Sequence, residues 1–157
     1  MANDGSTSPF SPADNPAVAA HVNLLQGIIT RLANNSASCK TWCLTLVGAL
    51  VSLAGATHVP GIITFALVPV VIFGFLDVMY LAQEKAYRDL YKSVVNSIHT
   101  GSYKLSDVYN ASSQLNGQHI WDAFLSWSIL PVYLGLIATY LIARFAGWFV
   151  YLIPATK

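Results

Sequence analysis

The chain has 157 residues, of which 55% are hydrophobic and 10% are charged, and its formal net charge is +1. An ordinary soluble domain has roughly 25% charged residues, so the composition favours an all-α integral membrane protein over a tightly packed soluble helical bundle. Nucleic-acid-binding proteins usually concentrate basic residues in a patch, and this charge balance argues against that class.

The first 18 residues are rich in Ser, Pro, Asn, Asp and Ala, and such a segment buries too little apolar surface to offset the entropy of ordering. We therefore expect a disordered tail over 1–18 and a single helical membrane domain over 19–157. From Ala17 to Cys39, apolar residues recur at steps of three and four, which predicts an N-terminal amphipathic helix at the membrane face. Asp14 and Asn15 can cap this helix, and Pro16 suits its first turn.

The end of this predicted helix is dense in short polar side chains. One interpretation is a solvated turn just outside the membrane. The other is a polar collar at a pore mouth, or a regulatory contact, and residue spacing does not separate the two. The candidate collar residues are Arg31, Asn34, Asn35, Ser38 and Lys40.

An uncharged run predicts a first transmembrane span at about residues 42–57, with Trp42 at the interface where aromatic belts lie. Gly48, Ser52 and Gly55 fall close to one face of this span. Small residues at such a spacing let transmembrane helices approach closely. Their packing partner is either the second span or a neighbouring copy of the chain.

A tight turn leads into a second span at about residues 62–82, completing a transmembrane helical hairpin, and Pro69 is expected to kink this helix. Asp77 lies near the polar end of the span. An ionisable group within a span is costly unless it meets a partner or water. Two interpretations stay open for Asp77: a structural anchor near the headgroups, or part of a polar path or gate.

The second helix is predicted to continue out of the membrane as a cytoplasmic stalk over residues 83–99. Within it, Glu84 and Arg88 have the favourable spacing and order for an ion pair on one helix face. Residues 100–118 form a polar loop punctuated by glycines.

A third span is expected at about residues 124–146, as one long tilted helix in which Gly135 allows close packing or a bend. Basic residues gather before the first span and after the second, and none lies in the hairpin turn. The positive-inside tendency therefore places the N-terminus and residues 83–123 in the cytoplasm.

Motifs for catalysis, phosphate binding or metal binding are not evident, so we expect no enzyme, no cofactor and no metal site. Cys39 and Cys43 stand one helical turn apart without other ligands and are interpreted as inert packing residues. The histidines are scattered and are interpreted as solvated or interfacial side chains; they are His21, His58, His99 and His119.

Three segments carry a resemblance: LLQGIITRLANNSASCKTWCLTLVGAL at 24–50, ALVPVVIFGFLDVMYLAQEKAYRDLY at 66–91 and FLSWSILPVYLGL at 124–136. Together they resemble SLATT-type membrane proteins, in which a transmembrane pair is followed by a long polar helix. The resemblance implies a pore-forming or membrane-disrupting effector of bacterial antiphage defence. It also implies a cytosolic sensor or nucleotidyltransferase partner, or the nucleotide product of that partner, as the trigger. The third span departs from the family's two-helix pattern.

The leading hypothesis is thus a homo-oligomer in the bacterial inner membrane that depolarises the cell when released, since three spans are too few to enclose a pore. Carboxylates would set the charge at the cytoplasmic mouth, as they do in cation pores. The alternative is a non-conducting accessory or scaffold subunit that anchors a cytosolic partner. The candidate pore or gate residues are Asp77, Glu84, Arg88, Ser52 and Thr45.

Overall fold

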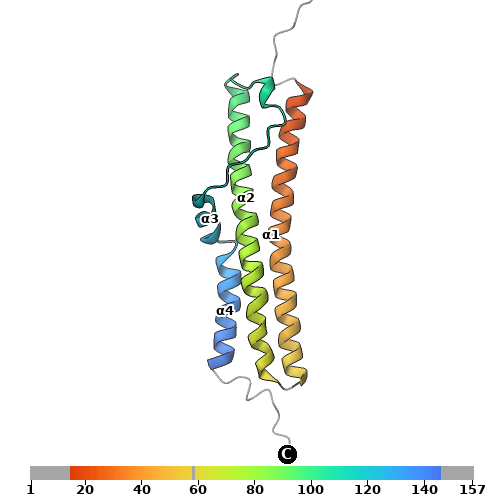
Figure 1. The fold of residues 1–157 in the computed structure, drawn as a ribbon, viewed down its shortest axis with the longest axis vertical. Helices are drawn as coiled ribbons and strands as arrows, with labels where there is room; N and C mark the ends of the chain where they lie inside the picture. Colours follow the sequence, from red (N-terminus) through yellow and green to blue (C-terminus); the bar gives the residue numbers. More distant parts are fainter. Residues whose placement is uncertain (1–14, 58, 146–157) are drawn as a thin grey trace, which may run out of the picture.

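The computed structural model describes residues 15–57 and 59–145, and all regular structure in these two ranges is helical. Two long helices run antiparallel as a hairpin, and shorter helices follow along one side (Figure 1). The elements are α1 (Pro16–Thr57), the 3-10 helix η2 (Pro60–Ala66), α2 (Leu67–His99), the 3-10 helix η3 (Leu105–Asp107), α3 (Gly117–Phe124) and α4 (Leu130–Phe145). The all-helical class predicted from the sequence is confirmed, and two long apolar helices form a hairpin.

Helix α1 is continuous over 42 residues, about 63 Å at 1.5 Å per residue. The predicted division into an amphipathic helix at 17–39 and a separate helix at 42–57 is therefore wrong, and so is the solvated turn between them. The short polar side chains do not break the helix because their hydroxyls bond to its own carbonyls. Ser38 and Thr41 each donate to the carbonyl four residues earlier, at 2.9 and 3.2 Å.

The start of α1 has the predicted cap. Asn15 Oδ1 accepts a hydrogen bond from the Ala17 amide at 2.9 Å, which satisfies one of the free amides of the first turn. The helix begins at Pro16, so residues 16–18 are helical instead of belonging to the predicted tail. The rest of that prediction, residues 1–14, lies outside the described residues.

The predicted kink at Pro69 is wrong, because Pro69 lies in the first turn of α2 and not in the interior of a helix. Before it, residues 60–66 wind as the tighter 3-10 helix η2. A proline lacks the amide proton for an α-helical bond, and its ring clashes with the carbonyl four residues earlier. The regular α-helix therefore starts only at Leu67, where the missing amide of Pro69 costs no bond.

Two apolar clusters hold the elements together along the length of the hairpin. The lower core joins α1, α2, α3 and α4 and consists of Cys43, Val70, Val78, Ala82, Ala123, Ile129 and Tyr133. The upper core joins the other halves of α1 and α2 to the loop after α2 and consists of Val18, Leu25, Val94 and Tyr103. Between them lies a polar layer formed by Ser36, Lys40, Asp77 and Glu84.

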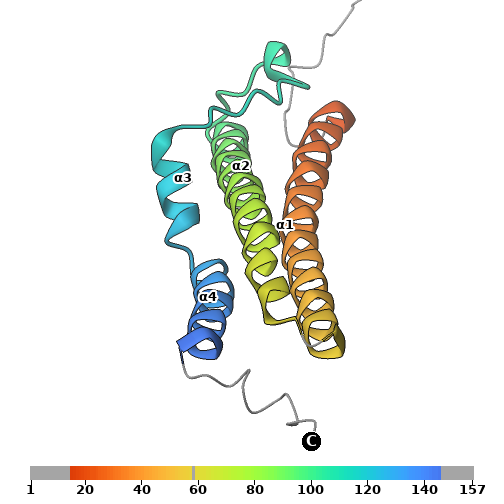
Figure 2. The same ribbon diagram turned by 60° about the horizontal axis from the view of Figure 1, so that its bottom comes forward.

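The chain after α2 returns along the hairpin to α3 and then to α4, so that α2 lies between α1 and α4 (Figure 2). The predicted single helix over 124–146 is instead divided: α3 ends at Phe124, and α4 begins at Leu130. Pro131 explains the break, because its ring excludes a helical carbonyl at Trp127. Residue 146 lies outside the described residues.

The hairpin helices are long and apolar enough to cross a membrane, by length and composition, in the segments Pro16–Thr57 and Gly61–His99. The apolar stretch of α4, Leu130–Ile142, is shorter. Large hydrophobic side chains remain exposed along the lower halves of α1 and α2 and on η2, among them Leu53, Val71 and Phe65. The predicted bilayer spans therefore fall on surfaces that the protein itself leaves uncovered.

Candidate functional site

The carboxylate of Asp77 is fully buried between α1 and α2, at the centre of the polar layer. Lys40 Nζ lies 2.9 Å from Asp77 Oδ1 and 2.7 Å from Oδ2, and Ser36 Oγ donates to Oδ1 at 2.5 Å. Lys40 Nζ also donates to Ser36 Oγ at 3.1 Å. The three side chains thus form one compact charged network, which we call the Lys40–Asp77 site.

The helical repeat explains why α1 supplies two of these groups. Ser36 and Lys40 are four residues apart and therefore lie on the same face of α1, one turn above the other. Asp77 Oδ2 lies 2.7 Å from the Lys40 ammonium and accepts no well-directed hydrogen bond, whereas Oδ1 accepts two. A buried carboxylate requires such compensation, so the site depends on the lysine.

A third helix reaches the Lys40–Asp77 site through Tyr133 of α4. Its hydroxyl donates to the Phe73 carbonyl at 3.2 Å and lies beside the Asp77 carboxylate. Cys39 and Cys43 of α1 are both reduced and buried nearby, as packing residues would be. Within residues 15–57 and 59–145, no group of three His, Cys, Asp or Glu side chains is placed to hold a metal ion.

Gly74 allows the close approach of α2 and α4. A Cβ atom added there would lie 3.4 Å from the Tyr133 ring. We expect Gly74→Ala to be tolerated and Gly74→Val to destabilise the protein by about 1–3 kcal/mol, because the branched side chain would displace Tyr133. Thermal unfolding in detergent micelles measures this. Gly27→Val is the control, since nothing lies within 4 Å of that exposed position on α1; an equal loss in both variants would contradict the prediction.

The five candidate pore or gate residues lie at different places in the protomer and form no common site. Asp77 is buried at the centre, and Glu84 lies higher on α2, where it pairs with Arg88 at 2.7 Å as the spacing predicted. Thr45 and Ser52 are exposed on the lower half of α1. Their hydroxyls donate to carbonyls of their own helix at 2.8 and 2.9 Å.

The predicted collar is a helical segment whose residues point in different directions. Of its five members only Lys40 joins the charged network. Asn35 is half-buried, and the remaining three are exposed; these are Arg31, Asn34 and Ser38. Ser36 stands among them in the sequence and contacts Asp77, but it is not part of the predicted collar.

A sequence signal for the Lys40–Asp77 pair does exist. In an antiparallel hairpin with a tight turn, residues equally distant from the turn face each other. Lys40 lies 18 residues before His58, and Asp77 lies 18 residues after Val59. The same rule pairs Gln26 with Tyr91, whose side chains are joined by a hydrogen bond of 3.0 Å.

The residues predicted to pack helices do not do so within the protomer. Nothing lies within 4 Å of a Cβ added at the three glycines of this set, and Ser52 is exposed. The second span is therefore excluded as the partner of the stripe on α1, because α2 packs against another face. A neighbouring copy stays a prediction. The residues concerned are Gly48, Ser52, Gly55 and Gly135.

In the upper core, His21 is completely buried, so its interpretation as a solvated side chain is wrong. Its Nδ1 lies 2.6 Å from the Tyr103 hydroxyl, and its Nε2 lies 3.2 Å from the Asn110 carbonyl. A carbonyl only accepts, so Nε2 donates to it and Nδ1 accepts from Tyr103. Burial raises the pKa of the Tyr103 hydroxyl, which keeps this donor protonated. The His21 network fixes the loop after α2 to the start of α1.

His119 connects α3 to the upper half of α2. Its Nδ1 accepts from the Asn116 amide, and its Nε2 lies 3.2 Å from Asp89 Oδ2. Hydrogen bonds from Lys92 and from His119 lower the pKa of the Asp89 carboxyl. These contacts hold α3 against α2.

Comparison with known proteins adds no relative: no family model, curated protein or solved structure matches this chain. The function must therefore be argued from the residues themselves.

Proposed function

We propose that the chain is a multi-pass, homo-oligomeric protein of the bacterial inner membrane that opens a conducting path and depolarises the cell. The observation that carries the proposal is the Lys40–Asp77 site. It is a buried ion pair between α1 and α2, and it lies where the apolar lower halves of these two helices begin. The role as an antiphage effector is supported by the resemblance of residues 24–50, 66–91 and 124–136 to SLATT-type proteins.

In this proposal the lower halves of α1 and α2 cross the bilayer together with α4. Residues 42–57 and 62–82 are about 24 and 31 Å long as helices, close to the ~30 Å hydrocarbon thickness. The upper halves form a stalk on the cytoplasmic side. Between residues 15 and 123, every Lys and Arg lies in the stalk half or in the polar layer, as the positive-inside tendency requires.

Oligomerisation follows from the size of the protomer, because three helices do not enclose a water-filled path. Gly48, Ser52 and Gly55 are exposed on α1 and offer a surface on which a neighbouring helix can approach closely. Thr45 lies on the same exposed part of α1, where its hydroxyl can face a path between copies.

In this proposal the arrangement in which Asp77 is buried and paired is a closed state. A carboxylate that lines a conducting path must face water, whereas Asp77 is completely buried and compensated by Lys40. The pair must therefore separate before Asp77 can act on ions. In this view the trigger, a cytosolic sensor or nucleotidyltransferase or its nucleotide product, acts on the stalk and separates α1 from α2 at this level.

The test is the membrane potential of cells that express the protein, followed with a voltage-sensitive dye. We expect Lys40→Gln to depolarise cells several times faster than the unchanged protein at equal membrane abundance, because the ion pair that holds the closed state is lost. Adding Asp77→Asn should reverse the gain, since the carboxylate at the path is removed. Lys92→Gln, which removes an exposed ion pair of the stalk, is the control and should have no effect.

A non-conducting scaffold is the second candidate, favoured by the length of the stalk and by the tight closure of the Lys40–Asp77 site. It requires that neither Lys40→Gln nor the double variant changes the potential, also when a candidate sensor or nucleotidyltransferase is co-expressed and during phage infection. That result would overturn the pore proposal.

A further inference from the structure

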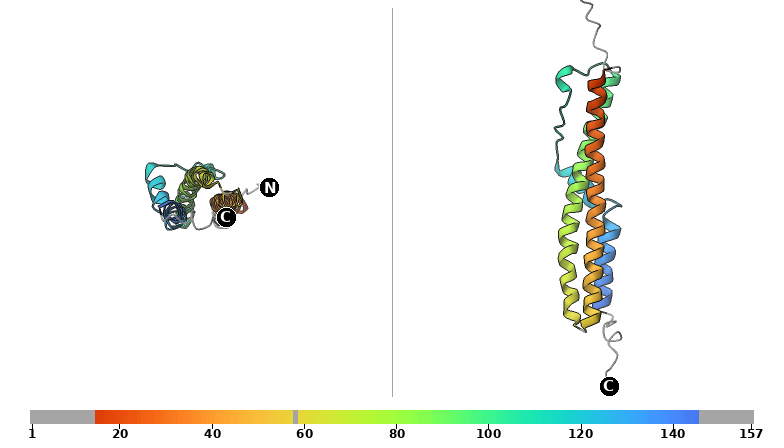
Figure 3. Two further views of the ribbon diagram at one scale, coloured as in Figure 1. Left: turned by 90° about the horizontal axis from the view of Figure 1, so that it is seen from below. Right: turned by 90° about the vertical axis from the view of Figure 1, so that its right-hand side faces the viewer.

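Helix α3 is slanted relative to the long axis of the molecule. In the view from below, α1 and α4 are seen nearly end-on, whereas α3 is seen partly from the side (Figure 3, left). It lies near the middle of the molecule's length, beside α2 and directly above the start of α4 (Figure 1). A helix with this slant is placed differently from the helices that run along the hairpin, and its outer face meets the surroundings at one level of the molecule.

One face of α3 is fixed to the protein. Ala123 is fully buried in the lower core. Lys85 Nζ donates to the Asp122 carbonyl at 2.5 Å, which satisfies one of the free carbonyls at the end of the helix. At the other end Asn116 caps the helix, and His119 contacts Asp89. The orientation of α3 is thus set by contacts at both of its ends.

The opposite face of α3 and the turn after it expose aromatic rings. Trp121 is 65% exposed and Trp127 is 90% exposed, and Phe124 is also exposed between them. Trp121 and Phe124 pack edge to face, with ring centroids 5.8 Å apart. Such an amphipathic helix, apolar on one face and bonded through polar groups on the other, is typical of helices that lie in a membrane interface.

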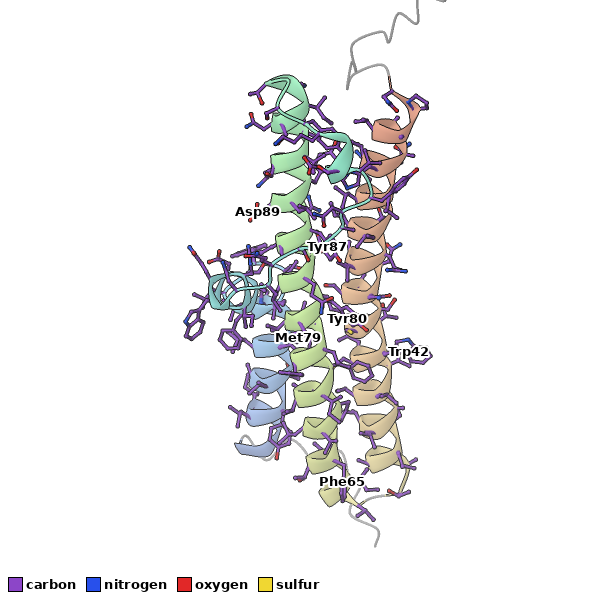
Figure 4. The ribbon with its side chains drawn as sticks, turned by 45° about the horizontal axis from the view of Figure 1, so that its top comes forward. Trp42, Phe65, Met79, Tyr80, Tyr87 and Asp89 are labelled. Atoms are coloured by element: carbon purple, nitrogen blue, oxygen red, sulfur yellow. The ribbon has the colours of Figure 1, made fainter. Side chains whose placement is uncertain are left out.

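A third tryptophan is exposed on a different element. Trp42 of α1 is 59% exposed and follows Lys40, the partner of Asp77, by two residues. It projects from the side of the molecule opposite α3 (Figure 4). A protein partner would cover one patch, whereas aromatic rings on opposite sides of the molecule fit a bilayer that surrounds it. Tryptophan prefers the boundary between headgroups and hydrocarbon.

The surface below α3 is apolar, as contact with acyl chains requires. A groove of about 390 Å³ runs between α2 and α4 under α3. Its lining includes Val71, Phe75, Ile120, Phe124 and Ile137. On the side that faces the hairpin turn, the exposed face of α3 is therefore continuous with an apolar surface suited to hydrocarbon.

We propose that α3 lies at the cytoplasmic boundary of the bilayer, with the rings of Trp121 and Phe124 inserted below the headgroups. This inference rests on the membrane location proposed above. Together with Trp42, α3 sets the depth of the protein, and it places the Lys40–Asp77 site at the water boundary instead of the bilayer midplane. The partner of this surface is the lipid bilayer itself.

The test uses full-length variants that each keep one tryptophan, at position 42, 121 or 127, with the other tryptophans changed to Phe. The variants are reconstituted in phosphatidylcholine vesicles with bromine near the headgroup end or near the terminal methyl of the acyl chains. We expect the emission of Trp121 to be lost more strongly with the shallow bromines than with the deep ones, to be blue-shifted, and to resist iodide. Helical circular dichroism verifies that each variant is folded.

The outcomes separate this inference from the proposed function. If Trp42 is quenched by brominated lipid but Trp121 is open to iodide and not to bromine, α3 lies in water and the inference is wrong, while the membrane location stands. If Trp121 is quenched most by the deep bromines, α3 is not interfacial, which also overturns the inference. If no tryptophan responds to brominated lipid, the proposed membrane function fails as well.

Discussion

Changing Lys40 to Met is expected to lower the free energy of unfolding by about 3–5 kcal/mol, because it leaves the buried Asp77 carboxylate without a compensating charge. Ser36 remains as a hydrogen-bond donor to Oδ1, but a hydroxyl cannot replace the ammonium 2.7 Å from Oδ2. Asp77→Leu should cost less, since Lys40 is 18% exposed and can turn towards water. Unfolding in mixed detergent micelles measures both losses.

The double variant Lys40→Met with Asp77→Leu should recover most of the loss, because a buried ion pair replaced by apolar side chains of similar volume is often as stable as the original. Lys92→Met is the matched control: it removes an exposed stalk pair and should change stability by no more than about 0.5 kcal/mol. Losses that simply add in the double variant would show that Lys40 and Asp77 do not stabilise each other.

The helical hairpin could be predicted because it depends on features that sequence displays directly. Long uncharged runs, a four-residue turn and the spacing of Glu84 and Arg88 all report local structure. The continuity of α1 could not be read in the same way. Asn and Ser favour turns when considered alone, yet in α1 Ser38 bonds to its own helix and the packing against α2 maintains the helix.

The Lys40–Asp77 site was predicted in part. The sequence alone indicates Asp77 as an ionisable group in an apolar run and Lys40 as a collar residue. Predicting that the two side chains pair requires the register of the hairpin. Counting from the turn supplies that register, as it does for Gln26 and Tyr91. Tyr133 could not be found by counting, because the break before Pro131 changes which face of α4 meets α2.

The His21 network lay beyond prediction because its partners come from an irregular loop. Tyr103 and Asn110 are 82 and 89 residues away from His21, and no periodic pattern relates them. Such contacts depend on the path of the loop, which at Gly101 requires a positive φ of 67° that glycine adopts readily.

The same network leads to the second large expected effect. His21→Ala should destabilise the attachment of residues 100–116 by about 2–5 kcal/mol, because it leaves a cavity in the upper core. It also removes the partners of the Tyr103 hydroxyl and the Asn110 carbonyl. Hydrogen–deuterium exchange should become faster across residues 100–116 and at the start of α1, while the lower core keeps its protection.

Tyr103→Phe removes only the hydroxyl and should give a smaller effect of about 1–3 kcal/mol, since it leaves His21 Nδ1 buried without a donor. Tyr109→Phe, in the same loop but exposed, is the control and should leave exchange unchanged. If it matched Tyr103→Phe, the hydroxyl of Tyr103 would not be what holds the loop.

The sign of the pH effect follows from the same hydroxyl. Burial raises the pKa of Tyr103 in the folded protein, so its contribution is complete below the ordinary tyrosine pKa of about 10. The contribution declines as the pH rises from there through the raised pKa, because the phenolate is disfavoured in the core and no longer donates to His21. Loop exchange, corrected for its intrinsic pH dependence, should therefore accelerate in strong alkali for the unchanged protein and not for Tyr103→Phe.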